Sequence, residues 1–92
     1  MKNIEEIRKY FGKLNLISKL ITQQKTGQIS NLATKIDELY DTTENYKNVI
    51  KNIASDHDVE TKWSRSKESF YFLPNVKINF NFEVKIEPIS EE

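Results

Sequence analysis

The residues with the most obvious chemical potential lie in one short segment, residues 55–60. This segment holds the only histidine of the chain, His57, together with the carboxylates of Asp56, Asp58 and Glu60. Imidazole and carboxylate groups are common metal ligands, but the chain has no second histidine and no cysteine to complete a site. We therefore expect a solvated loop in which Asp56 or Asp58 caps a turn, and no metal site.

Sequence signatures of enzymes are missing. The chain has no Gly-rich phosphate-binding loop, no GxSxG turn and no HExxH helix. It contains only two glycines, so close approaches of the backbone to a phosphate or nucleotide are not expected. A nucleophile–histidine pair would have to use His57 in its acidic loop. We predict that the protein is not an enzyme, has no catalytic residues and binds no cofactor.

One stretch, residues 62–72, mixes basic and aromatic side chains as single-stranded nucleic-acid platforms do. Glu60 and Glu68 flank its basic residues, and the chain carries 14 basic and 14 acidic residues, whereas a phosphate-binding protein usually has a basic excess on one face. Nucleic-acid binding is therefore the alternative function. The residues that would carry it are Trp63, Arg65, Lys67 and Tyr71.

Helical periodicity dominates the first part of the chain. From Ile4 to Ile21, apolar residues recur at spacings of three and four, which predicts a helix over residues 3–24. Leu16 and Leu20 form a second apolar stripe on the other side of this helix. A helix that is apolar on two sides is usually sandwiched between two neighbours, so this stripe contacts either the protein's own core or a partner.

A coiled-coil-like heptad pattern from Ile29 to Ile53 predicts a second helix over residues 29–55. Because only a short turn at Thr26-Gly27 separates the two helices, we expect an antiparallel helical hairpin. Ser18 and Thr43 are polar positions in its seam, and such residues more often fix the register of two helices than carry chemistry.

The most regular pattern is the alternation of apolar and polar residues from Val76 to Ile86. It predicts a strand with one dry face and one wet face. Residues 62–73 are the expected partner strand, with a tight turn at Pro74-Asn75. The register stays open, because a shift of one residue moves Phe70 and Phe72 to the opposite face.

The predicted fold class is α+β, with an antiparallel two-helix hairpin followed by a C-terminal β-hairpin packed on it. We expect a single domain over residues 1–92, comprising the helical hairpin 3–55, the β-hairpin 62–87 and an acidic tail 88–92. Within it, Trp63 is expected to be an anchor that joins the cluster beside Ile86.

Composition adds a cellular context. The chain has no cysteine, no uninterrupted apolar run typical of a signal peptide and no stretch long enough to cross a membrane. We therefore expect a soluble, cytoplasmic protein. Lys, Asn and Ile are favoured, which indicates A+T-rich codons. This codon usage suggests a low-G+C bacterium, or one of its phages or plasmids. If the gene is phage-encoded, the expected location is the host-cell cytoplasm.

These observations favour a small non-catalytic protein-interaction module, such as a phage or mobile-element accessory or inhibitor protein that binds a larger host protein. A lone two-stranded hairpin is marginally stable, so we also expect either that strands from two chains pair in a homo-oligomer or that another protein covers a strand edge. A structural subunit of a larger assembly is a further alternative. The residues expected to contact the partner are Leu16, Leu20, Trp63 and Tyr71.

Overall fold

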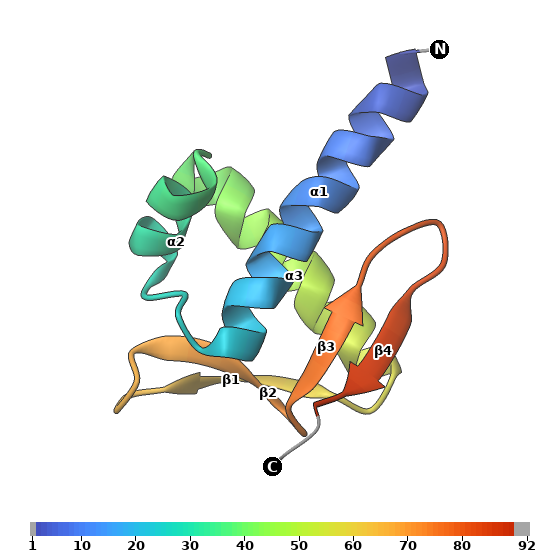
Figure 1. The fold of residues 1–92 in the computed structure, drawn as a ribbon. Helices are drawn as coiled ribbons and strands as arrows, with labels where there is room; N and C mark the ends of the chain where they lie inside the picture. The colour runs from blue at the N-terminus through green and yellow to red at the C-terminus, as the bar shows by residue number, and fades with distance from the viewer. Residues whose placement is uncertain (1, 90–92) are drawn as a thin grey trace.

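The computed structural model describes residues 2–89, which form three helices followed by four short strands. The elements are α1 (Lys2–Gln23), α2 (Ile29–Ile36), α3 (Tyr40–Asp56), β1 (Glu60–Ser64), β2 (Ser69–Leu73), β3 (Val76–Asn79) and β4 (Lys85–Pro88). The predicted α+β class is confirmed, and α1 matches the first predicted helix closely (Figure 1). Residues 90–92 of the expected acidic tail lie outside the described residues.

The predicted second helix is two helices, because the chain leaves helical geometry after Ile36. Asp37 adopts the left-handed conformation, with φ 60° and ψ 53°, and its N–H bonds to the carbonyls of the last turn of α2. The helix resumes at Tyr40. Leu39 continues the heptad spacing but is 76 % exposed, so the pattern runs across a break that spacing alone does not reveal.

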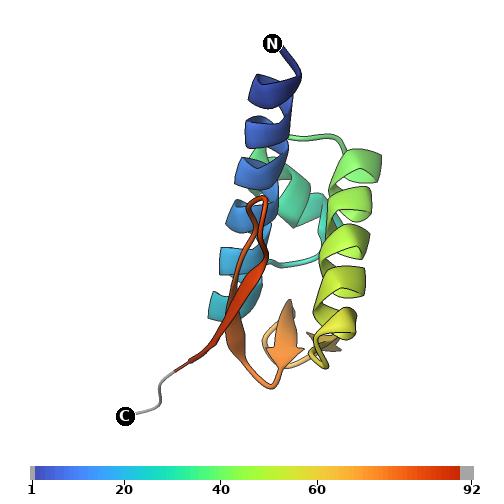
Figure 2. The same ribbon diagram turned by 90° about the vertical axis from the view of Figure 1, so that its right-hand side faces the viewer.

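The two long helices also run in the same direction, which corrects the expected antiparallel hairpin. In Figure 2, α1 and α3 both descend from the upper end of the molecule to the lower end, while α2 makes the return between them. The separate α2 makes this possible, since a continuous second helix would have to run opposite to α1. The N-terminal turns of α1 extend beyond the other elements (Figure 1).

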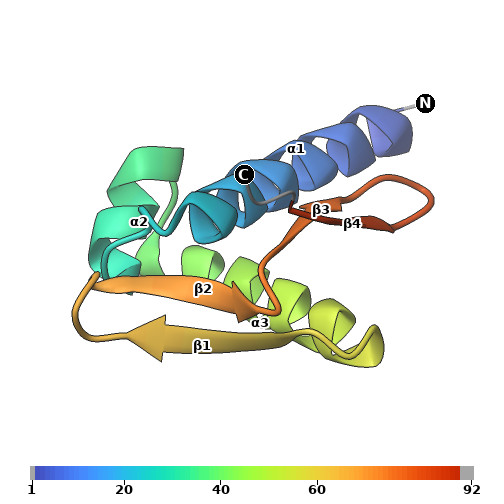
Figure 3. The ribbon, with the colours of Figure 1, turned by 60° about the horizontal axis from the view of Figure 1, so that its bottom comes forward.

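The strands form two separate antiparallel sheets, β1–β2 and β3–β4 (Figure 3). The expected pairing of residues 62–73 with 76–87 was wrong, because a turn at residues 65–68 closes the first hairpin instead. Glu68 supplies the left-handed position of this turn, with φ 51°. Pro74-Asn75 is not a hairpin turn but the connection from one sheet to the other.

The alternating segment from Val76 to Ile86 is likewise not one strand. β3 ends at Asn79, and the chain turns back to form β4 from Lys85 onward. The register pairs Ile78 with Ile86, so even-numbered residues face each other across the hairpin. The apolar face therefore continues through the turn without a change of phase, which is why the sequence pattern does not show the turn.

The core lies between the helices and the inner faces of the two sheets. Its largest members include Leu14, Ile17 and Ile21 of α1, Ile50 of α3, Phe72 of β2 and Phe80 after β3. Phe70 and Phe72 thus belong to the face of their sheet that meets the helices, although the strand they pair with is β1 and not the one expected. Among the described helices, none has the length and apolar character needed to cross a membrane.

Candidate interaction surfaces

Three polar side chains of α1 attach the helix to the edge of β3. Asn15 bonds to Phe80, Ser18 Oγ donates to Ile78 O at 3.1 Å, and Thr22 Oγ1 donates to Val76 O at 2.7 Å. Carbonyls of every second residue of a strand point to the same side, and the three α1 residues lie along one side of the helix. This side of α1 is therefore bonded to the protein's own strand.

A second polar contact holds the C-terminal end of α1 against β2. The Thr26 N–H donates to Ser69 Oγ at 2.9 Å, and Thr26 Oγ1 accepts from the Phe70 N–H at 2.9 Å. Thr26 and Ser69 are fully buried. Because buried polar groups are costly without partners, this pair fixes the position of the loop after α1.

The opposite side of α1 is partly open. Here a groove of about 520 Å³, which we call the α1 groove, lies between α1, the α2–α3 connection and α3. Its apolar and aromatic lining comes from Tyr10, Leu16 and Tyr46, with the backbone of Gly12 between them. Its charged lining residues are Glu6, Lys9, Lys13 and Glu38.

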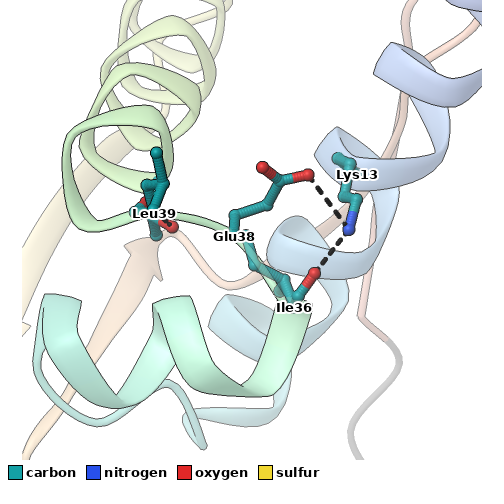
Figure 4. A network of polar contacts seen from close by, with 5 residues as sticks. Lys13, Ile36, Glu38 and Leu39 are labelled. Atoms are coloured by element: carbon teal, nitrogen blue, oxygen red, sulfur yellow. Dashed lines mark hydrogen bonds and ion pairs between the residues drawn. The ribbon is translucent and has the colours of Figure 1, made fainter.

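One wall of the α1 groove is held by Lys13. Its ammonium group donates to the Ile36 carbonyl at the end of α2 and pairs with Glu38, with 3.2 Å between Nζ and Oε2 (Figure 4). A cation at a helix C-terminus is favoured because the last carbonyls are unpaired and the helix dipole is negative there. Lys13 therefore ties the α2–α3 connection to α1 beside the groove.

The aromatic wall consists of Tyr10 and Tyr46, whose ring centroids are 5.6 Å apart with the planes tilted by 57°. Burial, followed by the nearby Glu38 carboxylate, raises the pKa of Tyr46 above its ordinary value. Gly12 leaves the space between this wall and Leu16 free, because a Cβ added there would meet nothing within 4 Å. The α1 groove is therefore open above the Gly12 backbone.

The structure separates the four residues predicted to contact a partner. Leu16 is 40 % exposed and lines the α1 groove, whereas Leu20 is partly buried and packs against the core. Trp63 is 38 % exposed and meets the edge of Phe70, with 4.9 Å between ring centroids, so it does not join the cluster beside Ile86. Tyr71 is half-buried.

The residues of the nucleic-acid alternative do not share one face. Trp63 lies opposite Phe70 and Tyr71 lies opposite Lys62, and successive residues of a strand point to opposite sides of a sheet. Trp63 is therefore on the side of the sheet that meets the helices, and Tyr71 on the other. Arg65 and Lys67 lie in the turn between β1 and β2.

The segment around His57 is exposed after the end of α3. Asp58 adopts a left-handed conformation with φ 64°, and its N–H bonds to Ser55 O at 3.0 Å, as in a turn. Within residues 2–89 there is no group of three or more His, Cys, Asp or Glu side chains placed to hold a metal ion.

Sequence reasoning missed most of the α1 groove. Tyr10 and Tyr46 belong to the apolar repeats of their helices, which give no reason to expect exposure. A single glycine within a helix, such as Gly12, indicates a kink or a close approach and does not identify a groove. The sequence signal that overlaps the groove is the Leu16/Leu20 stripe, through Leu16. Comparisons with protein-family models, curated proteins and solved structures find no match, so the functional proposal rests on the geometry of this chain.

Proposed function

We propose that this chain is a small non-catalytic protein that acts by binding another protein through the α1 groove. The observation that carries the proposal is an open site beside Gly12, lined by two tyrosines and Leu16. Tyrosine is enriched at protein interfaces because its ring supplies apolar contact and its hydroxyl group bonds to water or to a polar rim. A pocket of this kind accepts an apolar anchor from a partner.

The occupant that fits best is an amphipathic helix of the partner, with a leucine or phenylalanine inserted over Gly12. Helix-in-groove recognition uses apolar anchors spaced by three and four residues, with polar residues around them. The α1 groove supplies charges of both signs at its rim, Glu6 and Lys9 on α1 and the Lys13–Glu38 pair across it. Charges on the partner helix would therefore set its orientation rather than most of its affinity.

The chain is small and favours residues encoded by A+T-rich codons, namely Lys, Asn and Ile. Both features support an accessory or inhibitory protein of a phage or mobile element. A protein of this class acts by occupying a surface of a larger host protein and needs no catalytic residues. Its place of action would be the host-cell cytoplasm.

The test compares capture of partner proteins from a low-G+C bacterial lysate by the wild type and by Leu16→Gln. Leu16 is exposed, so the variant keeps its fold while the groove loses its aliphatic lining. Lys19→Gln, at an exposed position of α1 outside the α1 groove, is the matched control. We expect a protein retained by the wild type and by Lys19→Gln to be lost with Leu16→Gln.

Two outcomes contradict the proposal. Equal capture by all three proteins would place the contact elsewhere. A complex with single-stranded DNA that weakens steeply with salt and depends on Trp63 and Lys67 would favour the nucleic-acid alternative.

A further inference from the structure

The two edges of the β3–β4 sheet are treated differently by the fold. The outer edge of β3 is bonded to Asn15, Ser18 and Thr22 of α1. The outer edge of β4 has no such cover, because none of the described residues forms a hydrogen bond with its outward backbone groups. Uncovered strand edges pair readily with other strands.

The contact between α1 and β3 shows which backbone groups of β4 point outward. Both backbone groups of Phe80 bond to Asn15, so the even-numbered residues of β3 face α1 and the odd-numbered ones face β4. The register pairs even-numbered residues with even-numbered ones, so Ile86 and Pro88 direct their backbone groups away from β3. Pro88 suits this position because it has no N–H to leave unpaired.

We propose that β4 pairs antiparallel with β4 of a second copy of this chain, centred on Ile86. A two-fold axis at Ile86 places Lys85 opposite Glu87 of the partner subunit, and Glu87 opposite Lys85 of the partner subunit. Both residues are exposed on the same face of the sheet, so two cross-strand ion pairs form. This charge complementarity selects a second copy as the occupant and fixes the register.

The same register satisfies the backbone. Ile86 and the partner subunit's Ile86 exchange two hydrogen bonds, and the Val84 N–H donates to the carbonyl of the partner subunit's Pro88. Val84 and Ile86 are partly buried against the core, so their exposed edges meet across the axis. The product is a four-stranded antiparallel sheet with α1 of each copy at its two outer edges. This inference concerns a different surface from the α1 groove and does not depend on it.

The Lys85–Glu87 ion pairs can be tested by sedimentation velocity at protein concentrations of about 10 to 300 µM, a range suited to the weak association of a small interface. We expect the wild type to dimerise reversibly. Lys85→Glu places two carboxylates opposite each other and Glu87→Lys places two ammonium groups opposite each other, so each variant alone should dimerise about ten-fold more weakly. A mixture of the two variants restores both ion pairs and should form a heterodimer.

A matched pair controls for general attraction between oppositely charged proteins. Lys51→Glu and Asp56→Lys change the net charge by the same amounts at exposed positions of α3, away from β4, and their mixture should behave like the wild type. A wild type that stays monomeric throughout the range overturns the proposal and leaves the edge to another partner. Dimerisation that Lys85→Glu does not weaken overturns it as well.

Cysteine cross-linking tests the register independently, since the native chain has no cysteine. Residues 85 and 87 of opposite chains form a non-hydrogen-bonded pair, where Cβ atoms are close enough for a disulfide. Mixed Lys85→Cys and Glu87→Cys proteins should therefore oxidise mainly to a heterodimer, and each alone only slowly. Equal rates for all combinations would contradict the register.

Discussion

Asn15 of α1 bonds to both backbone groups of Phe80, accepting from its N–H at 2.6 Å and donating to its C=O at 2.9 Å. A side chain of a helix here takes the role of a neighbouring strand. Together with Ser18 and Thr22 it covers one edge of a hairpin whose strands are only four residues long. Such a hairpin would be marginal alone, so the helix stabilises it.

The first prediction concerns this contact. Asn15→Ala leaves a donor and an acceptor of the Phe80 backbone without partners in a partly buried site, which should lower the free energy of unfolding by about 1–3 kcal/mol. Urea denaturation followed by circular dichroism measures the change. Lys19→Ala, at an exposed position of the same helix, should stay within about 0.5 kcal/mol of the wild type. Equal stability of the two variants would show that the bonds to Phe80 contribute nothing.

The second prediction concerns the buried Thr26–Ser69 pair. Thr26→Val and Ser69→Ala should each lower the free energy of unfolding by about 1–3 kcal/mol, because each leaves buried groups unpaired. The double variant should lose less unfolding free energy than the two single variants lose together. Each hydroxyl group is the partner of the other, so the second substitution removes a group whose partner is already missing. Strictly additive losses in a double-mutant cycle would mean that the two side chains act independently.

The third prediction contrasts the two glycines. Gly12→Ala should raise the free energy of unfolding by about 0.5–1 kcal/mol, because Gly12 is in a helix interior and an added Cβ meets nothing within 4 Å. Gly27→Ala should lower it by about 1 kcal/mol or more, because Gly27 has φ +68° and a Cβ there would lie 2.9 Å from Asn31. Thermal unfolding of both variants measures the change. Unfolding temperatures that both rise or both fall relative to the wild type would contradict the different roles given to the two glycines.

The fourth prediction follows from the raised pKa of Tyr46, caused by burial and then by Glu38. The unfolded chain loses this proton at lower pH than the folded chain does. The folded state is therefore favoured by the protonated Tyr46 in full below the ordinary tyrosine pKa of about 10. This contribution to the free energy of unfolding is lost as the pH rises above that value. The unfolding free energy of Tyr46→Phe should fall less steeply than that of the wild type in this alkaline range. Parallel curves would rule out a shifted Tyr46.

The sequence predicted the α+β class and the first helix because their signals are local. The apolar residues of α1 repeat over many turns, and α1 covers residues 2–23 against the predicted 3–24. The side chains that decide the rest act over long distances. Asn15 and Phe80 are 65 residues apart, and nothing in the composition of α1 identifies its polar residues as partners of a strand edge.

The breaks between α2 and α3 and between β3 and β4 were not predicted, because the apolar repeat keeps the same phase on both sides of each break. Leu39 continues the heptad spacing although it lies between α2 and α3. Phe82 continues the alternation although it lies in the turn between β3 and β4, where it is 75 % exposed and meets Phe11 with ring centroids 5.5 Å apart. A periodic pattern reports which face a residue occupies, not whether the backbone between two such residues is continuous.

The α1 groove illustrates the same limit for function. Leu16 and Leu20 were predicted together because their side of the helix is apolar, but Leu16 lines the α1 groove whereas Leu20 packs against the core. The spacing places both residues on the same side of α1 but does not say which of them the rest of the fold covers. Tyr46 comes from a segment 30 residues farther along than Leu16 and meets the groove only through the tertiary fold.

The most direct test of the proposed function is site-specific photo-cross-linking from position 9, at the rim of the α1 groove. Lys9 is exposed and lines the groove, so a photoreactive phenylalanine analogue there faces a bound partner and leaves the space over Gly12 free. The matched control carries the analogue at Lys51, on the exposed side of α3. The proposal predicts a discrete cross-linked protein from position 9 only, which excess wild type displaces and excess Leu16→Gln does not. A product from position 51 but none from position 9, or equal displacement by both competitors, would contradict binding through the α1 groove.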